Sequence, residues 1–190
     1  MKKWLVFALI AVLVLGIAGC SGGEAEEADA PEAQDEAVEN TGLELADEIT
    51  LPEGWAMDAA ISAEEVGAIT GETMEYFPDA GSAAQSGSPI AQYMIAGEEG
   101  SGIRFAAKVE GGADVYDVLD QYAVEGTSEE IAGLADKAYM LELEDGDFAI
   151  VALKNDARYE IRFDPTFYEV DKGSMAADLM ATLLSNVYKP

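Results

Sequence analysis

Three apolar segments near the end of the chain, separated only by short polar turns, restrict the fold more than any other feature. They read "AYMLELE" (138–144), "FAIVALK" (148–154) and "ARYEIRF" (157–163). The pairs Asp145-Gly146 and Asn155-Asp156 lie between them. Asp-Gly is a strong signal for a tight two-residue turn, in which both residues need positive φ. Asn-Asp is a weaker signal but tolerates the same geometry. The sequence therefore predicts an antiparallel meander of three strands.

Two further strands are expected upstream, over 90–96 and 103–109, joined by the turn sequence "GEEGSG". A short strand is expected at 73–77, followed by a loop over 77–89 that is rich in Pro and Gly. In the second strand, Ile103 and Phe105 alternate with Arg104 and Lys108. Because strand side chains alternate between faces, the apolar and cationic residues are expected on opposite sides of the sheet.

Three segments are expected to be helical. The first follows Ser62, which forms a capping-box pattern with Glu65 and is followed by a stop at Gly71. The second is "ADVYDVLDQYA", with Val115, Val118, Leu119 and Tyr122 on its apolar face, and the third is an amphipathic helix over about 174–188. Together these elements predict an α+β fold: a two-layer sandwich, mainly antiparallel sheet, with helices on one face. Residues 49–190 are expected to form this single domain.

The first twenty residues have the pattern of a secretory signal. Lys2 and Lys3 precede an apolar run over 4–18, which is short for a helix that spans a membrane. The run ends in Ile17-Ala18-Gly19-Cys20, which resembles the lipobox of bacterial lipoproteins. The resemblance implies cleavage of residues 1–19, a diacylglyceryl group on Cys20, and attachment to the outer surface of a cell membrane. An uncleaved membrane helix and a signal peptide cut elsewhere are the alternatives.

Residues 20–48 are expected to form a lipidated, disordered tether. The segment 21–48 contains 11 acidic residues and no basic residue. Such a composition buries too little apolar surface to offset the entropy of ordering. A solvated spacer is the favoured interpretation, and a cation-binding tail is the alternative.

Charge and composition exclude several functions. Without Lys2 and Lys3 the chain carries 38 acidic and eight basic side chains, a net charge of −30, which disfavours nucleic acid as a partner. The sequence contains no histidine, and Cys20 is its only cysteine. Catalysis by Ser–His–Asp or Cys–His groups and zinc sites of Cys/His type are therefore excluded within this chain. Accordingly, we expect no catalytic residues, no cofactor, no metal and no enzymatic activity. Asp114, Asp117 and Asp120 are interpreted as a solvated helix face.

Four basic residues fall on two of the expected strands. Arg104 and Lys108 share one face of the first strand, and Arg158 and Arg162 share one face of the other. One interpretation is cross-strand pairing with glutamates, namely Glu142, Glu144 and Glu160. The sharper hypothesis is a local positive patch that holds an anionic ligand or an acidic segment of a partner.

Several features in this order resemble a group of actinobacterial-type lipoproteins of unknown function. They are the lipobox, the acidic tether, "SAEEVGAITG" (62–71), a strand containing Tyr93, and "GLADKAY" (133–139). That group is similar to extracellular sensor domains of receptor Ser/Thr kinases. The resemblance implies no catalytic residues, and Ala91 stands where the group often has a disulfide cysteine. We expect a membrane-anchored, extracytoplasmic binding or sensing module; the alternative is a structural or assembly accessory of the cell envelope.

Overall fold

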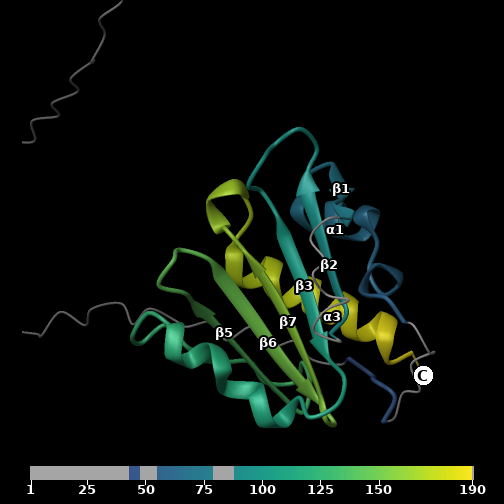
Figure 1. Ribbon diagram of the computed structural model, residues 1–190, viewed down its shortest axis with the longest axis vertical. Helices are drawn as coiled ribbons and strands as arrows, with labels where there is room; N and C mark the ends of the chain where they lie inside the picture. Colours follow the sequence, from purple (N-terminus) through teal and green to yellow (C-terminus); the bar gives the residue numbers. More distant parts are fainter. Residues whose placement is uncertain (1–42, 48–54, 79–87, 190) are drawn as a thin grey trace, which may run out of the picture. The chain divides into compact units, whose positions relative to one another are not determined.

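A seven-stranded antiparallel sheet forms the framework of the domain (Figure 1). The computed structural model describes residues 43–47, 55–78 and 88–189. The strand order is β1-β2-β3-β7-β6-β5-β4. The strands are β1 (Met74–Tyr76), β2 (Ile90–Ile95), β3 (Ile103–Lys108), β4 (Glu129–Glu130), β5 (Lys137–Glu142), β6 (Phe148–Lys154) and β7 (Ala157–Phe163).

Two α-helices, α1 (Ala63–Thr70) and α3 (Lys172–Val187), pack against one face of this sheet, which we call the helical face. In Figure 1, α3 crosses behind β3 and β7. Short 3-10 helices complete the described elements: η1 (Met57–Ala59), η3 (Ala113–Tyr122) and η4 (Pro165–Phe167). The α+β two-layer sandwich is therefore confirmed. No helix in the described part of the chain is both long and apolar enough to cross a membrane.

Helix α1 begins and ends where the sequence predicts. The Ser62 hydroxyl accepts a hydrogen bond from the Glu65 amide at 3.2 Å, and the Glu65 carboxylate accepts one from the Ser62 amide at 2.8 Å. Gly71 ends the helix with φ 79°, a value that glycine adopts without steric cost. These hydrogen bonds hold the pKa of Glu65 below its usual value, first through the Ser62 amide and then through Asn186 on α3.

Helix α3 supplies most of the second layer. Its buried side chains recur at helical spacing and contact the alternate residues of β6 and β7 that face them. The helix begins at Lys172, where the Asp171 side chain accepts a hydrogen bond from the Ser174 amide. A fully buried leucine contributes about 1.5–3 kcal/mol, so Leu179, Leu183 and Leu184 are the principal anchors of this layer.

Helix η3 differs from the expectation in type, in orientation and in position. It is a 3-10 helix that packs on the opposite face of the sheet, against β5 and β6, with Leu119 buried and Tyr116 partly buried. Val118 and Tyr122, expected to be buried, are 42% and 54% exposed. The contacts at 116 and 119 are three residues apart, which matches the repeat of a 3-10 helix and is also found on one face of an α-helix. Val115, expected on the apolar face, lies at a kink in this element, with φ −124°.

The two turns of the meander are formed differently. The amide of Gly146 donates to the Leu143 carbonyl, the amide of Leu143 donates to the Asp147 carbonyl, and Gly146 has φ 95°. This is a three-residue connection with one left-handed glycine, so the expected turn with two positive φ values is wrong here. In the second turn Asn155 has φ 55° and β7 starts two residues later, so the predicted two-residue connection is found, but Asp156 lacks the positive φ expected of both turn residues.

Four residues that we assigned to the tether contact the rest of the domain. Leu43 and Leu45 pack against the main core, and the Ala46 amide donates to the Tyr188 carbonyl at 3.1 Å. The Asn155 side-chain amide donates to the Asp47 carbonyl. The sequence did not predict this contact because the residues around the two leucines are mostly acidic or small. Leu43 and Leu45 are the apolar residues that attach this segment to the domain. Residues 1–42, including Cys20, and 48–54 lie outside the described residues.

We therefore expect two truncations to differ. Deleting 22–42 should leave the melting temperature within error, whereas deleting 22–47 should lower stability by about 1–2 kcal/mol, because two half-buried leucines are lost. For a domain of this size the second change corresponds to about 4 °C. Thermal denaturation followed by circular dichroism measures both. Equal melting temperatures would contradict a contribution of Leu43 and Leu45.

Candidate functional site

The four predicted cations lie together on one face of two neighbouring strands. β3 pairs with β7, so that Arg104 lies opposite Arg162 and Lys108 lies opposite Arg158. All four point away from the residues that contact α1 and α3. We call this side of β2, β3, β7, β6 and β5 the charged face. Its members are the alternate residues Ile90, Gln92, Met94, Arg104, Ala106, Lys108, Arg158, Glu160, Arg162, Ala149, Val151, Leu153, Lys137, Tyr139 and Leu141.

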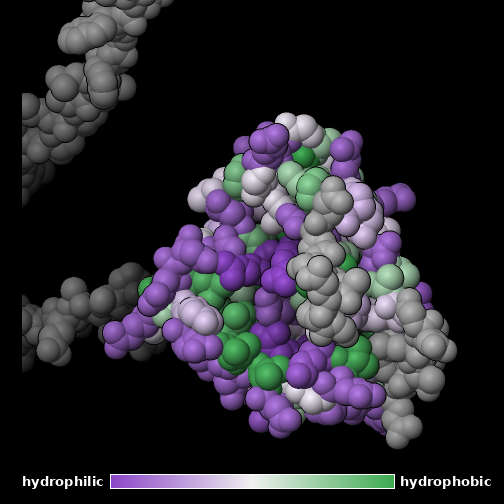
Figure 2. Space-filling model, viewed as in Figure 1, coloured by the Kyte–Doolittle hydropathy of each residue, from purple (hydrophilic) through white to green (hydrophobic). Residues whose placement is uncertain are grey.

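Charge is distributed very unevenly over the domain. Of the eight basic residues that follow Lys3, five lie on the charged face: Arg104, Lys108, Lys137, Arg158 and Arg162. The same strand positions carry one acidic residue, Glu160. Figure 2 looks onto this side and shows strongly hydrophilic residues in a hollow, with hydrophobic atoms beside them.

Arg158 and Glu160 form a buried ion pair at the centre of the face. They are only 7% and 9% exposed, and Arg158 Nη1 donates to Glu160 Oε2 at 2.8 Å. Arg158 Nε also points to the Tyr116 carbonyl of η3 at 3.5 Å. Burial raises the pKa of Tyr116 to about 12, and the nearby Asp117 adds to this effect. Helix η3 thus covers Arg158 and makes it part of the framework rather than of an accessible surface.

Arg162 is also engaged, by a partner that the sequence did not suggest. Its guanidinium pairs with both Asp145 and Asp147 in the turn between β5 and β6. Partial burial lowers the pKa of Arg162, but the bonds to Asp147 and Asp145 outweigh it and raise the pKa above its usual value. The two aspartates therefore neutralise Arg162 and fix the turn against the edge of the charged face.

The two cations of β3 are freer. The Arg104 side chain is 45% exposed and reaches Glu160 only at 4.0 Å. Lys108 is exposed and makes no ion pair with another described residue. Of the glutamates expected as partners, Glu160 pairs with Arg158 and Arg104, Glu142 pairs with Lys172 of α3, and Glu144 pairs with no described residue. The structure thus places all four cations on one face. Arg104 and Lys108 are exposed there, whereas Arg158 and Arg162 form close ion pairs within the domain.

An apolar pocket adjoins Arg162 on the same face. It has a volume of about 310 Å³ and lies between η3 and the β5–β6 turn. Its lining residues are Leu119, Tyr122, Leu143, Glu144, Asp145 and Arg162. The exposed Val118, Tyr122 and Val124 extend the apolar surface along η3 and beyond it. Sequence reasoning missed this part of the site because it assigned Val118 and Tyr122 to the core; the only signal was the three-residue spacing of Tyr116 and Leu119.

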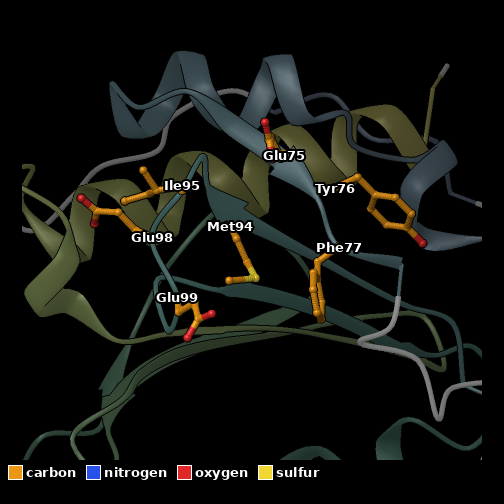
Figure 3. Close-up of a pocket in the computed structure, with 8 residues that line it drawn as sticks. Glu75, Tyr76, Phe77, Met94, Ile95, Glu98 and Glu99 are labelled. Carbon is orange, nitrogen blue, oxygen red and sulfur yellow. The ribbon is translucent and has the colours of Figure 1, made fainter.

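A second pocket, of about 270 Å³, lies at the edge of the sheet formed by β1 and the turn after β2. In Figure 3, Met94 and Phe77 point to the same side of these strands, and Glu98 and Glu99 come from the turn. The carboxylates that line the pocket, Glu75, Glu98 and Glu99, are all exposed, and no basic residue lines it. It therefore lacks the groups that would hold an anion, and it is separate from the predicted cations.

The charged face thus presents exposed cations beside an apolar pocket. Among the described residues, no group of His, Cys, Asp and Glu side chains is arranged to hold a metal ion. No family model matches the chain, and neither a curated protein nor a solved structure is similar to it.

Proposed function

We propose that this chain is a lipoprotein anchored through Cys20 to the extracytoplasmic face of the cell membrane, and that its folded domain is a binding or sensing module. The observation that carries the second part is the concentration of five of eight cations on one face of a strongly acidic chain. Among these five, Arg104 and Lys108 are exposed and have no carboxylate of a described residue closer than 4.0 Å. The ligand or partner is therefore expected to present negative charge to the charged face.

The strands of the charged face are suited to this role because they hold the cations in fixed positions. β3 is central in the sheet and pairs along its whole length with β7. Arg104 and Lys108 therefore project from a rigid support, and rigid support lowers the entropy lost when a ligand is bound. The exposed groups that it presents, a guanidinium and an ammonium, can bind a negatively charged ligand.

An assembly accessory of the cell envelope is the second candidate. The observation in its favour is the exposed apolar surface of Val118, Tyr122 and Val124 beside the charged face. Exposed apolar surface of this kind is typical of protein–protein contacts. Thermal-shift screening of the purified chain with anionic metabolites tests the binding role. A stabilising hit that is lost in the R104Q/K108Q variant supports a small-ligand sensor. Co-purification of an envelope protein without any such hit supports the accessory role.

Replacement of Cys20 tests the anchor. The Cys20→Ala chain lacks the sulfur that would carry the lipid, so we expect an unprocessed precursor or release of the protein from the membrane fraction. Two acyl chains give stable attachment, whereas a chain without them has no comparable anchor. Membrane fractionation and intact-mass analysis measure both effects. A variant that is still cut before residue 20 and is extracted only by detergent would show that attachment does not depend on Cys20.

A further inference from the structure

The kind of ligand that binds the charged face can be inferred from which of its cations are accessible. This inference rests on the proposed binding role. Arg158 is covered by η3 and paired with Glu160, and Arg162 is neutralised by two aspartates. Arg158 is therefore inaccessible to a ligand, and the charge of Arg162 is already compensated by the turn.

Arg104 and Lys108, both on β3, are exposed and have no close ion-pair partner among the described residues. Lys137 on β5 is exposed as well, but its ammonium group lies over the Tyr116 ring, 5.9 Å from the ring centroid. Contact with a ligand's negative charge therefore falls to β3.

The spacing of these two cations indicates a ligand with more than one anionic group. Arg104 and Lys108 are four residues apart on one strand, which places their Cα atoms about 13 Å apart at about 3.3 Å per residue. The residue between them on this face is Ala106, whose small side chain leaves space above the strand. Side chains that stand straight out from the strand keep their charges about this far apart, so an extended chain with separate acidic groups can contact both cations without bending them toward each other.

The neighbouring surface favours a polypeptide over other polyanions. The pocket of about 310 Å³ adjoins Arg162, which lies directly opposite Arg104. Leu119, Tyr122 and Leu143 give it an apolar wall, while Glu144 and Asp145 repel an anion at its rim. The pocket therefore suits an uncharged apolar side chain and rejects a carboxylate. Phosphate chains and anionic polysaccharides have no apolar side chain. An acidic peptide with one apolar residue can contact both the cations of β3 and the apolar pocket.

We propose that the charged face binds an acidic, extended segment of a protein partner, with its carboxylates on Arg104 and Lys108 and one apolar side chain in the pocket beside Tyr122. The attraction is local, because the domain as a whole is acidic and repels an acidic partner at long range. Recognition consequently depends on the match between the spacing of charges and the apolar anchor. This dependence gives specificity rather than general adhesion to negatively charged surfaces.

The test uses the full chain in detergent micelles and two fluorescent peptides of alternating Glu and Ala, one of which has a central residue changed to Leu. Anisotropy at about 0.1 M salt gives the two affinities. We expect the Leu peptide to bind at least about tenfold more tightly than the other, since a buried leucine contributes more than 1.4 kcal/mol. R104Q/K108Q should weaken both peptides at least about tenfold.

Two variants serve as controls. K172Q/K189Q removes two cations away from the charged face and should leave both affinities within about twofold, although it changes net charge equally. Y122S should remove the advantage of the Leu peptide and leave the other peptide unchanged. Binding of neither peptide below about 1 mM overturns the proposal. It is also overturned if R104Q/K108Q and K172Q/K189Q behave alike, or if polyphosphate binds as tightly as the Leu peptide. A small-molecule hit in the thermal-shift screen would leave the binding role intact in each case.

Discussion

Replacing Arg158 with Ala is expected to lower the free energy of unfolding by about 3 kcal/mol. The change leaves Glu160, which is 9% exposed, with only Arg104 at 4.0 Å to offset its charge. Breaking a buried ion pair by removing one partner costs about 3–5 kcal/mol. We expect the lower end because Arg158 Nη2 is buried and has no hydrogen-bond partner among the residues that the structure describes, and the substitution removes the cost of burying it. Urea denaturation at neutral pH measures the effect.

Two further variants separate the ion pair from simple loss of packing. R158M/E160M replaces both charges by apolar groups of similar length and should lie within about 1 kcal/mol of the parent chain, since such exchanges are often neutral or stabilising. R104A removes the exposed and distant partner and should cost less than about 1 kcal/mol. The uncompensated charge of Glu160 is not the cause if the double variant is as unstable as R158A.

The strands could be predicted because their pattern is governed by local alternation. β3 and β7 alternate apolar and charged residues, and β6, buried on both faces, is a nearly continuous apolar run. Turn residues fix the meander, and the β3–β7 pairing then places all four cations on one face. The order of strands, with β7 inserted between β3 and β6, depends on long-range contacts that no local pattern carries.

The parts of the site that escaped prediction depend on choices that are not local. Whether "ADVYDVLDQYA" forms an α-helix or a 3-10 helix decides whether Val118 and Tyr122 are buried or exposed. The neutralisation of Arg162 depends on a three-residue turn that directs Asp145 and Asp147 back over β7. We considered only glutamates on the strands as ion-pair partners of the four cations, and the aspartates of the turn were therefore missed. Leu43 and Leu45 were obscured by the acidic residues around them.

Gly112 is expected to be essential for the position of η3. A Cβ atom at this residue would lie 2.4 Å from the Arg158 amide nitrogen and 2.6 Å from the Asp156 carbonyl oxygen. Its φ of −64° is accessible to any residue, so the requirement for glycine is steric. Gly112→Ala should cost about 3 kcal/mol, at the upper end for overpacking, because the obstructing atoms belong to the backbone of a hairpin. The hydrogen bond from the Gly112 amide to the Asp156 carbonyl would be strained as well.

Gly173→Ala is the matched control, because its Cβ would meet only ordinary contacts such as Met140 Sδ at 3.5 Å. It lies in the first turn of α3 and should leave stability within about 1 kcal/mol of the parent chain. Denaturation curves of the two variants compare the sites directly. Peptide binding adds a second readout, since η3 forms one wall of the pocket, whereas Arg104 and Lys108 project from β3. In folded Gly112→Ala protein the Leu peptide should therefore lose its advantage, while the peptide without Leu keeps its affinity. Equal stability of the two glycine variants would show that η3 shifts without cost and that its wall is not fixed by the contact with β7.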